Sequence, residues 1–199
     1  MQSTKAKIDS AAKQAFALYG YDGLRMRQLA QQAGVSLSVT YHYYQDKDSL
    51  LERLFAETVK LLGQKRQQLP QRSRAATMLK DRIGFQLDHA VDIVFILKYY
   101  LHYRDRYQAN PTGYLPETAY THIKEVLRHG EAQNEWHLQQ PIEQEAKVIT
   151  HAINGFVLEY FPAPLAKTEK AALITSIHDF IVRALQAGSV AKQGSNTLS

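Results

Sequence analysis

The chain has 199 residues, of which 45% are hydrophobic and 22% charged, a composition typical of a soluble globular protein of one or two domains. It contains no cysteine, which excludes disulfides, thiolate metal sites and a cysteine nucleophile. No apolar run approaches the roughly 18 residues of a membrane span, and the polar N-terminus lacks the apolar segment of a secretory signal. We therefore expect a cytoplasmic protein without membrane attachment.

The positive charge of the chain is concentrated toward its N-terminus. The formal net charge is +5. Residues 1–60 carry a surplus of two basic groups, residues 61–82 a surplus of five, and residues 83–199 a deficit of two. Clustered basic residues favour a polyanionic partner, although a solvated basic helix end accounts for the charge equally well.

Hydrophobic residues recur with helical period along almost the whole chain, and no segment shows the alternation of a strand. Gly20 and Gly34 are expected to end helices, Ser36 and Asp46 to cap them, and Pro70 to close the N-terminal block. The pattern predicts an all-α fold of about nine helices, at residues 4–19, 26–33, 37–44, 47–69, 74–90, 91–107, 116–134, 141–160 and 168–187.

Two short predicted helices joined by the turn Ala33–Ser36 form a helix-turn-helix pattern. Gly34 supplies the turn conformation without a Cβ penalty, and Ser36 caps the second helix. That second helix, residues 37–44, is short enough to lie in a major groove and carries hydroxyl and imidazole groups on most of its faces. A helix polar all round requires a polar partner, so the pattern predicts binding to duplex DNA.

Basic residues flank this pattern on both sides. Lys47 lies in the first turn of the following helix, where free backbone N–H groups and the helix dipole favour a phosphate. Arg25 and Arg27 lie at the start of the preceding helix and are predicted to contact the other side of the groove.

Residues 4–62 resemble the DNA-binding domain of TetR-family transcriptional regulators. The matching positions are Gly20, Leu29-Ala30, Ala33–Ser36, Tyr41-x-Tyr43-Tyr44, Lys47 and Leu50. The resemblance implies a homodimer that reads a palindromic operator and is released by a small molecule, and hence a repressor. It departs at Arg25, where the family usually has a capping Thr or Ser, and at Tyr44, where Phe is common.

Carried over residue by residue, the resemblance divides the DNA-contacting side chains into two groups. Base or groove contacts fall to Leu37, Ser38, Thr40 and His42. Phosphate contacts fall to Tyr41, Tyr43 and Lys47. Ser36, Arg25 and Arg27 are predicted to bind DNA from their own chemistry and position, without this resemblance.

The C-terminal half carries two further predictions. The last two helices have apolar surfaces wider than one core requires, which predicts a four-helix interface with a second copy; its residues are Ile149, Ile153, Tyr160, Leu173, Ile177, Phe180 and Ala184. The middle helices are rich in aromatic residues, which suits a pocket for an apolar or aromatic effector; its predicted lining is Phe85, His89, Ile96, Tyr99, Tyr100, Tyr103, Tyr107 and Phe156.

Together these observations predict four segments: a helix-turn-helix domain in residues 1–48, a connecting helix and basic linker in 49–72, an effector and dimerisation domain in 73–187, and a disordered tail in 188–199. Two other classes remain open, a helical interaction module and a small metal-dependent enzyme. Asp88, His89 and Asp92 fall within one helical turn, but no P-loop, HExxH or dinucleotide motif occurs. We therefore predict a non-enzymatic regulator without a cofactor.

Overall fold

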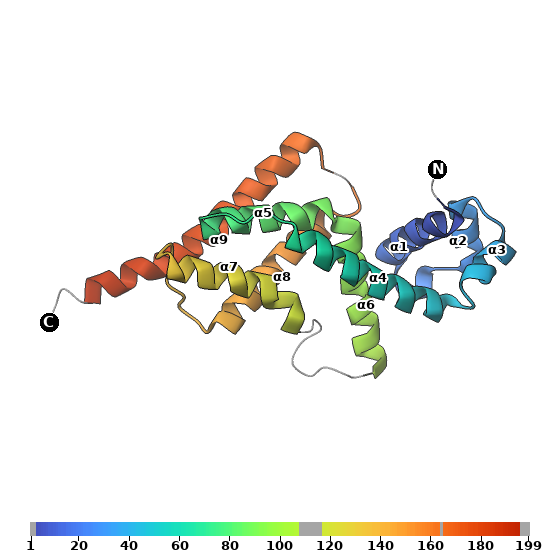
Figure 1. Ribbon diagram of the computed structural model, residues 1–199, viewed down its shortest axis with the longest axis horizontal. Coiled ribbons are helices and arrows are strands. Elements are labelled where there is room, and N and C mark those ends of the chain that lie inside the picture. The colour runs from blue at the N-terminus through green and yellow to red at the C-terminus, as the bar shows by residue number, and fades with distance from the viewer. Residues whose placement is uncertain (1–2, 108–116, 164, 196–199) are drawn as a thin grey trace. The chain divides into compact units, whose positions relative to one another are not determined.

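A computed structural model describes the backbone of residues 3–107, 117–163 and 165–195, and the side chains of residues 3–103, 118–163 and 165–187. Within these ranges the protein forms nine α-helices and one short 3-10 helix, with no strand, as the sequence predicts (Figure 1). None of the described helices is long and apolar enough to cross a bilayer. The chain divides into two compact units.

Unit 1 comprises residues 1–67 and 90–115. Its helices are α1 (Thr4–Gly23), α2 (Met26–Ala33), α3 (Leu37–Tyr43), α4 (Lys47–Gln67) and α6 (Ala90–Tyr107). Apolar side chains from these helices form one core, which includes Ile8, Phe16, Leu29, Leu50, Leu54 and Phe95.

The helix ends of unit 1 follow from local sequence. Gly20 has φ 70° and kinks α1, and Gly34 ends α2 in the left-handed conformation with φ 65°. Ser36 Oγ accepts the N–H of Val39 and so caps α3. Asp46 and Ser49 bond reciprocally at the start of α4, which also holds the pKa of Asp46 below its usual value. The predicted roles of Gly34, Ser36 and Asp46 are confirmed, whereas Gly20 kinks α1 and does not end it, because the helix continues to Gly23.

Unit 2 comprises residues 68–89 and 116–199. Its described elements are α5 (Ala75–Asp88), a 3-10 turn (Glu117–Tyr120), α7 (Thr121–Ala132), α8 (Ile142–Tyr160) and α9 (Lys167–Ser195). Trp136 is fully buried and donates its indole N–H to the carbonyl of Leu127. The Glu135 carboxylate accepts the N–H groups of Ala75 and Ala76 and thus caps α5 from a distant part of the chain.

Two features differ from the predicted organisation. α6 belongs to unit 1, whereas the sequence predicted its residues to lie in the effector domain. The reason is that its apolar face packs on α1 through Phe16 and Phe95, and that Lys13 of α1 pairs with Asp92 of α6 at 2.6 Å. The backbone of α9 continues as helix to Ser195 rather than ending at Ala187. The predicted turn at residues 108–113 and the last four residues of the predicted tail lie outside the described residues.

Candidate nucleic-acid interface

The α2–α3 pair has the geometry of a helix-turn-helix. The N–H groups of Gly34 and Val35 both bond back into α2, at 3.1 and 3.0 Å, and close the turn. The hydroxyls of Ser36 and Ser38 lie 2.9 Å apart beside the start of α3. The turn therefore presents the first residues of α3 to solvent on a fixed backbone.

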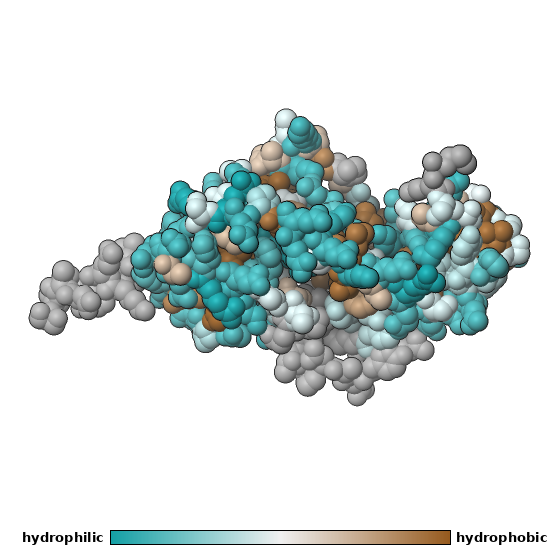
Figure 2. All heavy atoms as spheres, in the orientation of Figure 1, coloured by the Kyte–Doolittle hydropathy of each residue, from teal (hydrophilic) through white to brown (hydrophobic). Residues whose placement is uncertain are grey.

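Most of the predicted contact residues of α3 are exposed. Ser38, Tyr41, His42 and Tyr43 face solvent, with Tyr41 46% and Tyr43 38% exposed. Large aromatic rings are usually buried and are enriched at interfaces, so two exposed rings on one short helix indicate a surface that a partner covers. In Figure 2 the visible surface around α3 combines polar residues with a small hydrophobic patch, a mixture suited to base edges and thymine methyl groups.

Thr40 differs from its neighbours because its side chain is fully buried. Its hydroxyl donates to the Ser36 carbonyl at 3.3 Å, while its methyl group lies in the core of unit 1. Thr40 therefore anchors α3 and does not reach a base in this structure, which corrects its predicted place among the base-contacting residues. The period of a helix of seven residues was enough to predict this, since Thr40 lies opposite the exposed face.

The end of α3 is held by a buried phenol. Tyr44 is 2% exposed and donates its hydroxyl to Asp9, which also pairs with Lys5 at 2.6 Å. Burial and the bond to Asp9 raise the pKa of Tyr44 to about 12. Desolvation opposes charge on Lys5, but its bonds to Asp9 and Tyr44 prevail and raise its pKa to about 12. The Tyr44 ring thus occupies a core position, while its hydroxyl is satisfied by Asp9.

Lys47 has a structural role that the sequence did not reveal. Its ammonium donates to the carbonyls of Tyr21 and Leu24 at 2.9 and 3.3 Å and lies 4.0 Å from the centre of the Tyr21 ring. Lys98 of α6 donates to the Leu18 carbonyl at 2.9 Å. Two lysines from other helices thus stabilise the negative C-terminal end of α1, whose own last turn has no basic residue. The phosphate contact of Lys47 stays a prediction.

The remaining predicted DNA contacts lie around this framework. Arg25 and Arg27 are exposed at the start of α2. Arg25 occupies the N-cap position, and no side-chain bond caps the helix there. The departure at Arg25 from the usual Thr or Ser therefore leaves the first N–H groups of α2 without a side-chain acceptor from their own cap residue. Leu37, at the start of α3, is half-buried.

The structure places the predicted effector residues in two different units. Ile96, Tyr99, Tyr100 and Tyr103 lie on α6 in unit 1, while the remainder of the described set lies in unit 2 and comprises Phe85, His89 and Phe156. Tyr99 stacks on Phe55 of α4, and the Tyr103 hydroxyl donates to Glu52. These rings therefore join α6 to α4. The side chain of Tyr107 lies outside the described residues.

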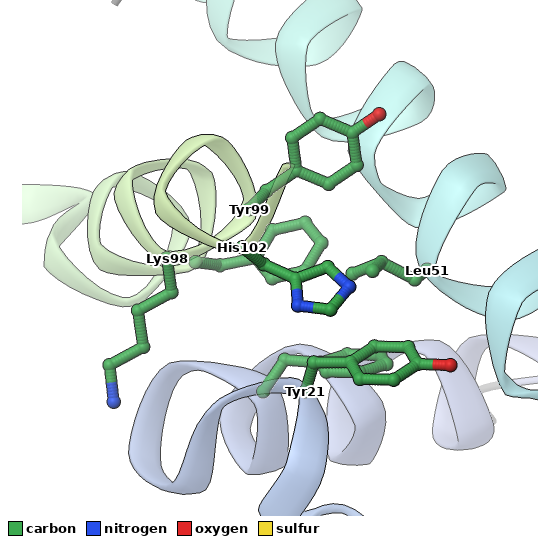
Figure 3. A pocket seen from close by; sticks show the side chains of 7 residues that line it. Tyr21, Leu51, Lys98, Tyr99 and His102 are labelled. Atoms are coloured by element: carbon green, nitrogen blue, oxygen red, sulfur yellow. The ribbon is translucent and has the colours of Figure 1, made fainter. Parts of the chain in front are cut away.

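A small cavity lies among α1, α4 and α6 in unit 1 (Figure 3). The imidazole of His102 lies over the Tyr21 ring, with 4.2 Å between centroids, and Lys98, Leu51 and Tyr99 complete the visible wall. Its volume of about 10 Å³ accommodates no more than a single water molecule. This cavity, as the described residues form it, is therefore too small for an effector.

The predicted dimer residues divide by exposure. Ile149, Ile153 and Ile177 are at most 4% exposed and pack inside unit 2, and Ile149 also lines the groove between α8 and α9. Phe180 is 64% and Tyr160 39% exposed; Ala184 is exposed and Leu173 half-buried. Val148, which is 60% exposed and was left out of the predicted set, lies with Phe180 along a groove of about 280 Å³ between α8 and α9.

The predicted metal alternative receives no support from the described residues, among which no three carboxylate, imidazole or thiol groups cluster. Asp88 pairs with Lys170 in unit 2, and Asp92 pairs with Lys13 in unit 1. Each carboxylate of the trio thus has a lysine partner.

The first unit matches a family model. Residues 8–54 match the model described as bacterial regulatory proteins, tetR family. A similar protein is an HTH-type transcriptional repressor of Mycobacterium tuberculosis, 35% identical over 57 residues, which cover 29% of this chain and 30% of that repressor. The repressor AcnR of Corynebacterium jeikeium is 33% identical over 60 residues, or 30% of this chain and 32% of AcnR. The match spans less than a third of the length of these relatives.

Likeness to solved structures extends over most of the chain. The MbdR regulator from Azoarcus sp. CIB superimposes with a TM-score of 0.68 at 16% identity, over 90% of this chain and 97% of MbdR. At this identity the match concerns the fold alone. It confirms the all-α architecture in which a helix-turn-helix segment precedes a larger helical region.

Proposed function

Because residues 8–54 belong to the TetR family of bacterial regulatory proteins, we propose that the whole chain is a DNA-binding transcriptional regulator that acts as a repressor and not as an enzyme. The observation that carries the proposal is the exposed face of α3, where Ser38, Tyr41, His42 and Tyr43 project from a helix fixed by Thr40. Hydroxyl and imidazole groups on a groove-sized helix bond to base edges and phosphates. The names of the relatives, both repressors, support the direction of regulation.

The proposed regulator acts as a homodimer on a palindromic operator. The support is the exposed apolar face of α8 and α9, where Val148 and Phe180 remain open to solvent beside a groove of about 280 Å³. An isologous interface places the same face of both copies together, and the groove of one copy can then receive an apolar ring of the other. Two recognition helices related by a twofold axis read two half-sites.

A substitution on this face tests the dimer. Phe180→Asp places a charge in the proposed interface, while the exposed face of the protomer tolerates it because Phe180 is 64% exposed. We expect the variant to sediment as a monomer at concentrations at which the unaltered protein is a dimer, and to bind a palindrome more weakly than the wild type. Phe180→Asp sedimenting as a dimer would contradict this interface.

The proposed repressor releases its operator when a small molecule binds in unit 2. Release requires only that the ligand favour a state with poorly placed recognition helices by a few kcal/mol. A retardation assay compares operator affinity with and without saturating ligand. We expect the ligand to lower it, and an unchanged affinity would refute release by the ligand.

DNA binding itself is tested by selecting bound duplexes from a random pool at low ionic strength. We expect an enriched palindrome. Ser38→Ala and His42→Ala should each reduce the preference for the favoured base, measured as a ratio of affinities, by about tenfold at one or two operator positions. Ser176→Ala, at an exposed serine of α9, is the matched control and should select the same sequence as the wild type. No enrichment of any duplex would refute the proposed function.

A further inference from the structure

A groove of about 280 Å³ lies between α8 and α9 in unit 2. Its apolar lining comes from both helices and includes Val148 and Ile149 of α8 and Phe180 and Ile181 of α9. Small-molecule sites typically enclose about 300–1,000 Å³, so this groove is close in size to the smallest of them. It can therefore hold a compact apolar ligand, whereas the cavity of about 10 Å³ in unit 1 cannot.

Two half-buried polar side chains line the same groove. Glu145 belongs to the first turn of α8, and His137 lies in the segment before that helix. Neither side chain has a hydrogen bond or an ion pair among the residues that the structure describes. The described lining includes no lysine or arginine, so the Glu145 carboxylate gives the groove a negative charge that no cation of the lining offsets.

The position of Glu145 near a helix N-terminus does not explain why its side chain is half-buried. The helix dipole favours an acidic residue in this turn, and Glu143 provides one that is exposed. A carboxylate that loses hydration beside apolar side chains, without a cation or a donor in return, costs free energy. An ammonium ion in the groove offsets this cost, and a hydrocarbon group attached to it covers the apolar lining.

From these observations we propose that the groove binds a small apolar amine, and that this amine competes with the second copy of the proposed homodimer. The second half of this statement rests on the proposed function; the first half does not. The ammonium donates charge-assisted bonds to the Glu145 carboxylate, and the His137 imidazole, in its neutral form, supplies a further acceptor. Because the amine and an apolar ring of the second copy need the same space, binding of the amine separates the dimer.

Binding is tested by titration calorimetry on the full chain without DNA. Hexylamine and 2-phenylethylamine, both cations at neutral pH, are compared with the alcohols of the same skeleton, 1-hexanol and 2-phenylethanol. We expect at least one amine to bind at least about tenfold more tightly than its alcohol, because the alcohol brings no charge to the carboxylate. Failure of both amines to bind, or equal affinity of each amine and its alcohol, would overturn the proposal.

Glu145→Gln is the diagnostic variant because it removes the charge and preserves the shape of the side chain. We expect amine affinity to fall about tenfold, while alcohol affinity and the melting temperature without ligand stay the same. Glu143→Gln, at the exposed carboxylate of the same turn, is the matched control and should bind the amine as the wild type does. Ala152→Leu adds bulk to the groove lining and should weaken binding of amine and alcohol alike. Unchanged amine binding in Glu145→Gln or in Ala152→Leu would refute the site.

Sedimentation then tests the competition with the second copy. We expect saturating amine to convert the wild-type dimer into monomer, and Glu145→Gln to remain dimeric at the same amine concentration. A dimer that persists with the amine bound refutes the competition and leaves the groove as a ligand site. If Glu145→Gln is monomeric without amine, the carboxylate serves the second copy and the proposal is overturned. A wild type that is monomeric from the outset refutes the proposed dimer, and calorimetry still decides the groove.

Discussion

Replacing Lys47 with alanine tests whether this residue holds the helix-turn-helix unit together. The substitution removes the two bonds to the carbonyls of Tyr21 and Leu24 and the contact with the Tyr21 ring. A bond from a charged donor contributes about 1.5–3 kcal/mol, and an exposed cation–π contact about 0.5–1 kcal/mol. Because Lys47 is half-buried and the second bond is long, we expect a total loss of about 2–3 kcal/mol.

A loss of this size lowers the melting temperature of a protein of this length by about 5–10 °C. The assay is thermal unfolding followed by circular dichroism, combined with operator binding at several salt concentrations. The matched control is Lys60→Ala on the same helix, at an exposed lysine, which should change the melting temperature by less than about 2 °C.

The salt dependence distinguishes the structural role from a phosphate contact. One lost phosphate contact reduces the slope of log affinity against log salt by about 0.9. If the two carbonyls are the sole partners of the ammonium, Lys47→Ala weakens binding at every salt concentration with an unchanged slope, whereas the predicted phosphate contact adds a slope reduction of about 0.9. A melting temperature equal to that of the wild type, with a slope smaller by about 0.9, would refute the structural role and support the phosphate contact.

Two further predictions concern stability. Gly130→Ala would place its Cβ 2.0 Å from Trp136 Cε2, and because Trp136 is fully buried we expect a loss of about 3 kcal/mol or more on urea unfolding; Gly63→Ala, with nothing within 4 Å of its Cβ, should instead gain up to about 1 kcal/mol. The pKa of Tyr44 is raised to about 12 from 10.0 in the folded protein, so its contribution is complete below pH 10 and is lost as the pH rises from 10 to 12. Tyr44→Phe should lose stability at pH 8 yet show a shallower decline between pH 10 and 12, and an identical decline in both proteins would contradict the assigned pKa.

Local chemistry made the helix ends predictable. Gly34 ends α2 through its own left-handed backbone, and the Ser36 side chain caps α3 by accepting the N–H of Val39, three residues on. Because both effects are local, the sequence alone was sufficient to predict them. The same holds for Asp46, whose reciprocal bonds with Ser49 are a sequence-local cap. The exposed face of α3 also followed from spacing. Thr40 is the exception: its hydroxyl suggested a base contact, but the helical period places it on the buried face.

Long-range partners were not predictable in this way. Glu135 caps α5 from sixty residues away, and Lys47 reaches the end of α1 across 26 positions. The sequence around Glu135 and Lys47 does not distinguish them from charged residues that are simply exposed to solvent.

The aromatic residues of α6 show why a shared helix face does not identify its partner. Tyr99 and Tyr103 were grouped correctly, because their spacing of four places them on one side of the helix. The same stripe can line a ligand pocket or pack on another helix, and periodicity does not distinguish the two. Phe55 and Glu52 on α4 supply the deciding contacts: a stacked ring and a carboxylate that accepts both hydroxyls.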